Sequence, residues 1–352
     1  MNKTEYMNRM RDLMENVDQD IVEEILQDYE EHFSMGVKEG RTEEEIAAEL
    51  GDPEEMAKEL KDICGQQQHT EQRSGGEYEP QSVRRLNLEC VSADVEIEVS
   101  EDGMFHLRYE NDGSLRSKTM MRFRGEQKGT TYYAKEEVRE GGLFGINRIE
   151  NCSTRFLIEV PQGFEEIEIR TTSGDIEIED VKLEGNLRIQ TVSGDVNLES
   201  EAMHDCEIIS TSGDIEIEDV RLEGKLRVQT VSGDVNLDNE TIHGCDIITT
   251  SGDVEVEETV STNLAVKTVS GDVNLDELEA GRVDISTTNG DVEICMSDAC
   301  EGYTLKGKTM SGDIDVAHGE ISKDFVGASC YIVGDGTCEI NIKTVSGDIT
   351  VR

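Results

Sequence analysis

The sequence contains no tryptophan, and aromatic residues make up only 4% of it. Sites that bind sugars commonly stack them on aromatic rings, so this scarcity argues against a carbohydrate-active enzyme. Basic residues are also few: 33 Lys and Arg stand against 79 Asp and Glu, a formal net charge of −46. Such a surface repels phosphate backbones and anionic lipids, so we expect neither nucleic acid nor a membrane surface as partner.

Long apolar runs are missing as well. No stretch reaches the roughly 18 residues of a membrane span, and no apolar segment typical of a signal peptide follows Met1. We therefore expect no direct membrane span and a cytoplasmic location, with the cell surface as the alternative.

The nine cysteines include no Cys-x-x-Cys motif. Cys295 with Cys300, or Cys330 with Cys338, could form a disulfide, but free thiols in a reducing compartment are the favoured interpretation. Two cysteines without histidine partners fall short of a zinc site. The sequence also contains no nucleophile constellation and no Gly-rich phosphate loop, so we expect no enzyme activity, no catalytic residues and no cofactor.

Residues 1–64 have apolar residues at helical spacing, among them Met10, Leu13 and Phe33. Thr42–Glu45 has the pattern of a capping box, and Gly51-Asp52-Pro53 that of a helix end followed by a new start. The pattern predicts a small all-α bundle of three or four helices. Residues 65–82 that follow are polar and are expected to form a linker.

The segments Asp28–Phe33 and Leu50–Ala57, with their Leu-Gly-Asp-Pro-Glu signature, resemble the HAAS signalling domain. This resemblance implies that residues 1–64 contact a protein partner, for which a PadR-type transcription regulator is a candidate. Self-association and a simple solubilising cap are the alternatives.

From residue 83 to residue 352 the sequence is a repeat array. The tripeptide Ser-Gly-Asp recurs at a spacing of 19 or 20 residues between 173 and 289, a period typical of solenoids. Its serines are Ser173, Ser193, Ser212, Ser232, Ser251, Ser270, Ser311 and Ser346, with variants at Ser92 and Asn289.

Aligned on this serine, the repeats have apolar residues six and four positions before it and three and five positions after it. Each pair predicts a half-buried strand, and the odd step between the pairs requires a bend at Ser-Gly-Asp, where glycine permits unusual backbone angles. The prediction is a mainly β fold, a single-stranded-coil β-solenoid of ~20-residue rungs preceded by the helical bundle. Residues 100–160 and 317–340 interrupt the array. The first segment is expected to cap or flank its N-terminal side, and the second to cap its C-terminal side.

A hydroxyl residue lies two positions before nearly every serine. Stacked one rung apart, these hydroxyls are expected to hydrogen bond along the array. They are Thr171, Thr191, Ser210, Thr230, Thr249, Thr268, Thr287, Thr309 and Thr344.

The repeated Thr-x-Ser-Gly-Asp-(Ile/Val) rung, as in Thr171–Ile176, resembles the bacterial "putative adhesin" β-strand-repeat family, and Phe156–Phe164 fits that family's first strand. The resemblance implies the fold and names no ligand.

The aspartates of the tripeptide form a column in which Asp195, Asp214, Asp234 and Asp253 are candidate calcium ligands. A structural role within the turn is favoured, because every rung has the residue. The sequence thus favours a non-enzymatic interaction and scaffold protein, and the alternative is an adhesin-like surface protein that binds calcium or glycan through the solenoid.

Overall fold

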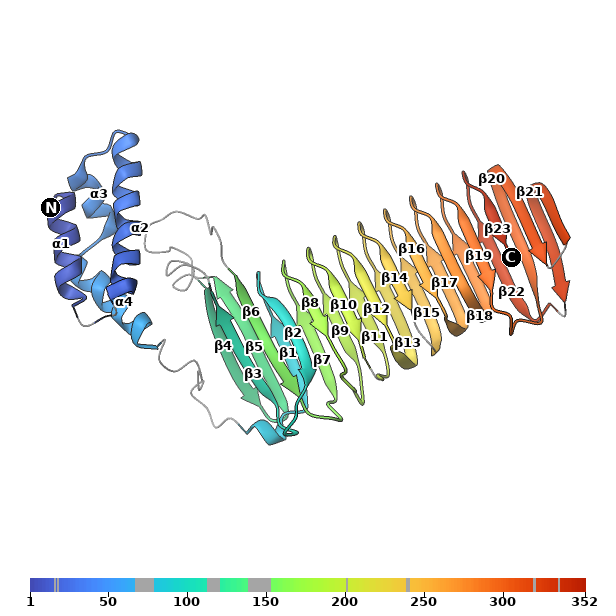
Figure 1. Cartoon of the computed structure of the whole chain (residues 1–352), viewed down its shortest axis with the longest axis horizontal. Coiled ribbons are helices and arrows are strands. Elements are labelled where there is room, and N and C mark those ends of the chain that lie inside the picture. Colours follow the sequence, from blue (N-terminus) through green and yellow to red (C-terminus); the bar gives the residue numbers. More distant parts are fainter. Residues whose placement is uncertain are drawn as a thin grey trace. The chain divides into compact units, whose positions relative to one another are not determined.

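The computed structural model describes residues 1–15, 17, 19–66, 79–112, 121–138, 153–200, 202–238, 241–318, 321–334 and 336–352. It contains a group of helices and a long β array, each described by itself below (Figure 1). Most of the predicted linker, residues 67–78, lies outside the described residues, as do 113–120 and 139–152 of the predicted N-terminal cap.

The helices are α1 (Lys3–Leu13), α2 (Gln19–Lys38), α3 (Glu43–Leu50) and α4 (Pro53–Gln66). Their apolar faces form one core, in which Tyr6, Met10 and Phe33 are almost fully buried. Capping boxes begin α1 at Asn2 and α3 at Thr42, where side chains accept the first free backbone N–H groups. The predicted helical bundle is confirmed.

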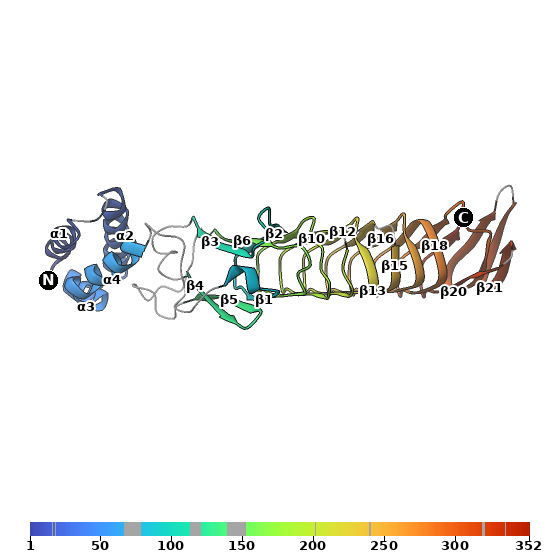
Figure 2. The same ribbon diagram turned by 90° about the horizontal axis from the view of Figure 1, so that it is seen from below.

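The array consists of short strands in consecutive pairs, joined by the Ser-Gly-Asp corner. The strands before each corner stack to form what we call the first face, and those after it form the second face (Figure 2). The strands are β1 (Arg85–Glu89), β2 (Asp94–Val99), β3 (His106–Asn111), β4 (Met121–Lys128), β5 (Thr131–Val138), β6 (Thr154–Val160), β7 (Glu166–Arg170), β8 (Ile176–Ile178), β9 (Leu187–Gln190), β10 (Val196–Glu199), β11 (Cys206–Ile209), β12 (Ile215–Glu218), β13 (Arg221–Gln229), β14 (Val235–Asp238), β15 (Thr241–Ile248), β16 (Val254–Glu257), β17 (Val260–Lys267), β18 (Val273–Ser286), β19 (Val292–Met296), β20 (Gly302–His318), β21 (Ile321–Gly334), β22 (Cys338–Lys343) and β23 (Ile349–Val351).

Neighbouring rungs pair in parallel and in register, so like residues stack. On the first face Leu226 lies opposite Cys206 on one side and Cys245 on the other. On the second face Ile215 lies between Val196 and Val235. All six side chains are buried, and their columns form the core. The predicted β-solenoid is confirmed, with one strand segment before the corner and one after it.

The rungs near the C-terminus do not stack in sequence order. The last rung of the chain, β22 and β23, pairs on one side with β18 and β19 and on the other with β20. Outside β20 lies β21, which runs antiparallel to it. Residues 321–334 therefore cover this end as predicted, whereas Cys338–Lys343 return into the array as β22. At the other end β5 stacks on β1, and β6 pairs with β2, as predicted for residues 100–160.

The predicted hydrogen bonding between stacked hydroxyls is wrong. Thr171, Thr191, Ser210 and Thr230 donate instead to the carbonyl of the serine two residues later. The hydroxyls of Thr249, Thr268 and Thr287 are buried without a hydrogen-bond partner. Thr309 and Thr344 donate to backbone carbonyls of the adjacent rungs, those of Gly347 and Gly290, so the acceptors are backbone carbonyls rather than stacked hydroxyls.

At the corner, consecutive rungs approach backbone to backbone. Gly233 has φ of 135°, and a Cβ there would lie 2.1 Å from the carbonyl oxygen of Gly213 in the previous rung. A side chain at this position meets both an unfavourable backbone angle and an immovable neighbour.

We expect Gly233→Ala to lower the free energy of unfolding by about 1–3 kcal/mol, because the corner must distort to admit a methyl group. Gly244→Ala is the matched control: its nearest neighbour is Lys225 Cγ at 3.8 Å, and its φ is not positive. Chemical denaturation should separate the two variants. Equal stability for both would show that the corner does not require glycine.

Candidate functional site

The four aspartates predicted as calcium ligands lie in one column, as the stacking requires. Each is held by a backbone hydrogen bond: the N–H of Asp214 donates to Asp195 Oδ1 at 2.8 Å, and that of Asp234 to Asp214 Oδ1 at 2.8 Å. The N–H of Asp253 donates to Asp234 Oδ1 at 2.7 Å, and Asp253 Oδ1 accepts from Asp272 at 2.7 Å. One oxygen of each carboxylate therefore accepts a hydrogen bond from the next rung.

We call this column the aspartate ladder. It extends from Asp94 in the first rung to Asp313 in the outermost one, through the same kind of bond in every rung. Charge-assisted bonds of this kind are stronger than bonds between neutral groups. Within the described parts of the chain, no three His, Cys, Asp or Glu side chains converge in a way that could hold a metal ion.

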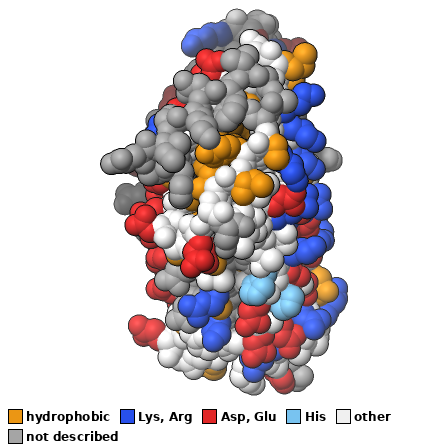
Figure 3. Space-filling view, turned by 90° about the vertical axis from the view of Figure 1, so that its right-hand side faces the viewer, with side chains coloured by type: hydrophobic (Ala, Val, Ile, Leu, Met, Phe, Trp, Pro, Cys, Tyr) orange, Lys and Arg blue, Asp and Glu red, His pale blue; other side chains and the backbone are white. Residues whose placement is uncertain are grey.

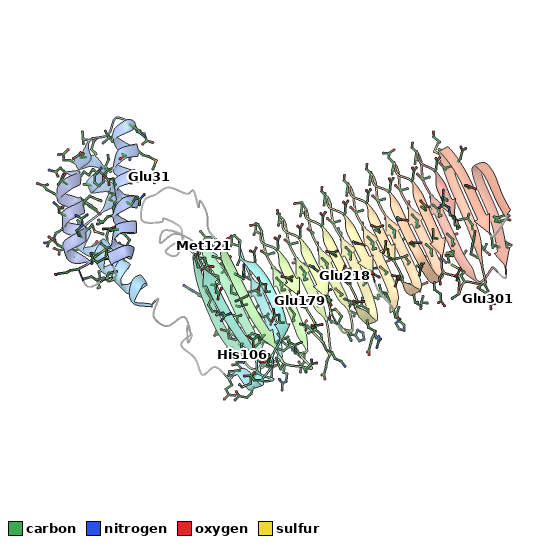
Figure 4. All side chains as sticks on the ribbon, viewed as in Figure 1. Glu31, His106, Met121, Glu179, Glu218 and Glu301 are labelled. Atoms are coloured by element: carbon green, nitrogen blue, oxygen red, sulfur yellow. The ribbon has the colours of Figure 1, made fainter. Side chains whose placement is uncertain are left out.

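The most concentrated charge lies on the second face. Its outward positions between β8 and β18 contain Asn, Asp and Glu and no Lys or Arg, and Figure 4 labels Glu179 and Glu218 on rungs two steps apart. We call these acidic side chains the acidic face: Glu177, Glu179, Glu199, Glu216, Glu218, Asp238, Glu255, Glu257 and Asp276.

The pKa values of two carboxylates on the acidic face are raised. The pKa of Glu218 is raised, first by partial desolvation and then by the carboxylates of Glu216 and Asp238. Desolvation, Glu255 and Asp238 raise the pKa of Glu257 in the same way. Both shifts mean that the ionised form of these carboxylates is disfavoured, first by desolvation and then by the neighbouring carboxylates.

The first face is different, because its outward positions mix both signs. Arg188 forms an ion pair with Glu207 at 2.8 Å, Arg282 with Asp284 at 2.6 Å, and Lys306 with Glu339 at 2.5 Å. Sequence reasoning predicted the aspartate column but missed this contrast. The signal was present: the residues four and six positions after the serine are acidic or amide-bearing in nearly every central rung.

Cys206, Cys245, Cys295, Cys300, Cys330 and Cys338 are free thiols. Cys206 and Cys245 lie in the core, where burial raises the pKa of Cys206 to about 12 and shifts that of Cys245 in the same direction. Thiols with such raised pKa values are poor nucleophiles, so these two residues act as small apolar side chains.

Stacked Ser-Gly-Asp rungs with hydrogen-bonded corners define a β-solenoid repeat protein. The chain belongs to the Toastrack DUF4097 family, whose model matches residues 83–352. Residues 5–59 match the HAAS family. The HAAS match supports a role in protein interaction, since HAAS domains pair with PadR-like regulators.

Two solved structures are similar to this chain. One is titled a "putative cell adhesion protein" from Clostridium sporogenes, with 12% identity, 78% of this chain and 95% of the other covered, and a TM-score of 0.21. The other is titled a "putative adhesin" from Bacteroides fragilis, with 13% identity, 77% and 94% covered, and a TM-score of 0.39. No curated protein matches the chain.

Among the described residues, no helix combines the length and apolar character needed to cross a membrane.

The raised pKa of Glu218 predicts a pH-dependent gain from Glu218→Gln. The folded state holds the Glu218 proton more tightly than the unfolded state, so ionised Glu218 destabilises the fold at neutral pH. The variant should therefore be more stable than the wild type at pH 7. The gain should fade as the pH falls through the raised pKa and vanish below about 4.3, the ordinary Glu value.

Denaturant midpoints across this pH range provide the measurement. Glu207→Gln is the matched control, because it removes the acceptor of the Arg188 ion pair and should give no gain at pH 7. A gain for Glu218→Gln that is independent of pH would contradict ionisation of Glu218 as its cause.

Proposed function

We propose that this chain is a non-enzymatic interaction protein in which the helical module of residues 1–64 binds a protein partner and the acidic solenoid is a rigid scaffold. The observation that carries the proposal is the combination of a HAAS match over residues 5–59 with a repeat array over residues 83–352. Among the described residues, the rungs repeat the same buried apolar columns and the same aspartate bond at the corner.

The scaffold role rests on how the array is held together. Each rung buries its apolar columns only against the next, and the aspartate ladder ties the corners rung by rung. Bending the array would open many of these contacts at once. A solenoid of this kind keeps its two ends at a fixed separation, which is what a scaffold requires.

For the partner we propose a PadR-type transcription regulator, supported by the pairing of HAAS domains with such regulators. Its recognition surface would lie on the helical module, which is the part of the chain that matches the HAAS family. A regulator of transcription works in the cytoplasm, and we propose that location for this chain.

Affinity capture from the native host tests the proposal. The full chain is compared with a chain lacking residues 1–64, and circular dichroism checks that the shortened chain keeps its β signal. We expect the full chain alone to retain a transcription regulator. Retention of the same regulator by both forms would place recognition on the solenoid and contradict the proposal.

A second candidate function is calcium binding at an exported, adhesin-like surface, with the acidic face as the observation in its favour. The raised pKa values of Glu218 and Glu257 mean that these carboxylates would gain from a nearby cation. The free oxygen of each ladder aspartate lies one rung, ~4.8 Å, from the next.

Thermal unfolding of the full chain in calcium, compared with magnesium at equal ionic strength, tests this alternative. Bound calcium would raise the melting temperature by mass action, and the double variant Asp214→Asn with Asp234→Asn would reduce the rise. The amide oxygen can still accept the ladder N–H, so the variant removes charge with little change to the corner. An equal response to both cations would reject a dedicated calcium site.

A further inference from the structure

The strand at the C-terminal end of the array has an open edge. Thirteen residue pairs join β21 to β20, from Gly302 with Gly334 to His318 with Ile321, and among the described strands β21 has no other partner. Figures 1 and 2 show β21 as the outermost strand of this end. Its outward backbone groups therefore form a template on which another strand can pair.

Apolar side chains are exposed at this end. Met310 is 77% exposed and Ile332 is 64% exposed, the two highest values among the large hydrophobic residues that the structure describes. Figure 3, which faces this end, shows apolar side chains gathered together on it.

The exposure of Met310 has a structural cause. β20 follows the corner through residues 309–312, whereas β21 passes from Ala328 to Val326 and bypasses it. Met310 thus protrudes at a corner that has no covering rung.

Charge is nearly absent from this strand. Phe325–Gly334 is the longest run without a charged residue in the sequence, and β21 as a whole has one Lys and one Asp. At the other end of the array, four of the eight residues of β4 are charged, and Arg124 and Lys128 form ion pairs with Glu137 and Glu126. Charged side chains are the common protection of an edge strand, and only the C-terminal end lacks it.

We propose that β21 pairs antiparallel with β21 of a second copy of this chain, joining two solenoids end to end. Charge favours this end as the contact between two copies, because two chains of net charge −46 repel wherever their acidic faces approach. Contact through the uncharged end keeps those faces apart. An antiparallel pair of identical strands is also self-complementary about a two-fold axis, so it forms a closed dimer rather than a filament.

The test is the mass and maximum dimension of the full chain in solution, measured by light scattering after size exclusion and by small-angle X-ray scattering. We expect a dimer that is markedly longer than the monomer. Ile332→Lys and Cys330→Lys, both at exposed positions of the edge strand, should each weaken dimerisation by about tenfold or more.

Val231→Lys is the matched control, since Val231 is 48% exposed at a corner in the middle of the array, and its dimer should persist. Unchanged melting curves would show that all three variants fold. A wild-type chain that stays monomeric up to high micromolar concentration overturns the proposal. So does a dimer that survives both edge variants, which would place the interface elsewhere, or a monomer that adds a strand from a different protein at this edge.

Discussion

The close approach of glycine backbones at the Ser-Gly-Asp corner is the constraint on which the array depends. The N–H of Gly233 donates to Ser251 in one neighbouring rung, while its Cα faces the carbonyl of Gly213 in the other. The adjoining N–H of Asp234 then bonds to the Asp214 carboxylate. Because the corner fixes both the spacing and the register of successive rungs, the residues on either side can form continuous buried columns.

The same register arranges the charges. Once the apolar positions are fixed inward, the intervening residues must stack outward, one rung above another. On the first face these residues pair as Arg with Glu, and on the second they place carboxylates beside carboxylates. The array tolerates this repulsion because the acidic face is exposed and screened by solvent, whereas its apolar columns are fully buried.

The repeat period of the sequence predicts much of this architecture. Residues such as Ile215 and Leu226 recur at fixed distances from the corner, so their burial and pairing could be predicted without coordinates. The aspartate column followed from the same alignment. The acidic face did not, because outward residues of both signs occur along the sequence, and only their stacking separates the acidic second face from the mixed first face. The stacking order could not be predicted either: the rungs of Asn289, Ser311 and Ser346 present the same columns, so any two of them can pair. The threonine hydroxyls show a further limit, since periodicity places a donor but does not choose between its acceptors.

The stacking order of the C-terminal rungs bears on the exposed edge at which every open solenoid ends. Every Ser-Gly-Asp rung is a template for another, so an array that ended on such a rung could add rungs from other chains without limit. Here the last rung of the sequence is enclosed between β18 and β20, and an antiparallel strand without the repeat covers β20. That strand bypasses the β20 corner and has no Ser-Gly-Asp corner or ladder aspartate of its own for a further rung to stack on. Growth by parallel stacking is thereby blocked at this end, and only an interaction with a different geometry, such as antiparallel pairing, remains open to it.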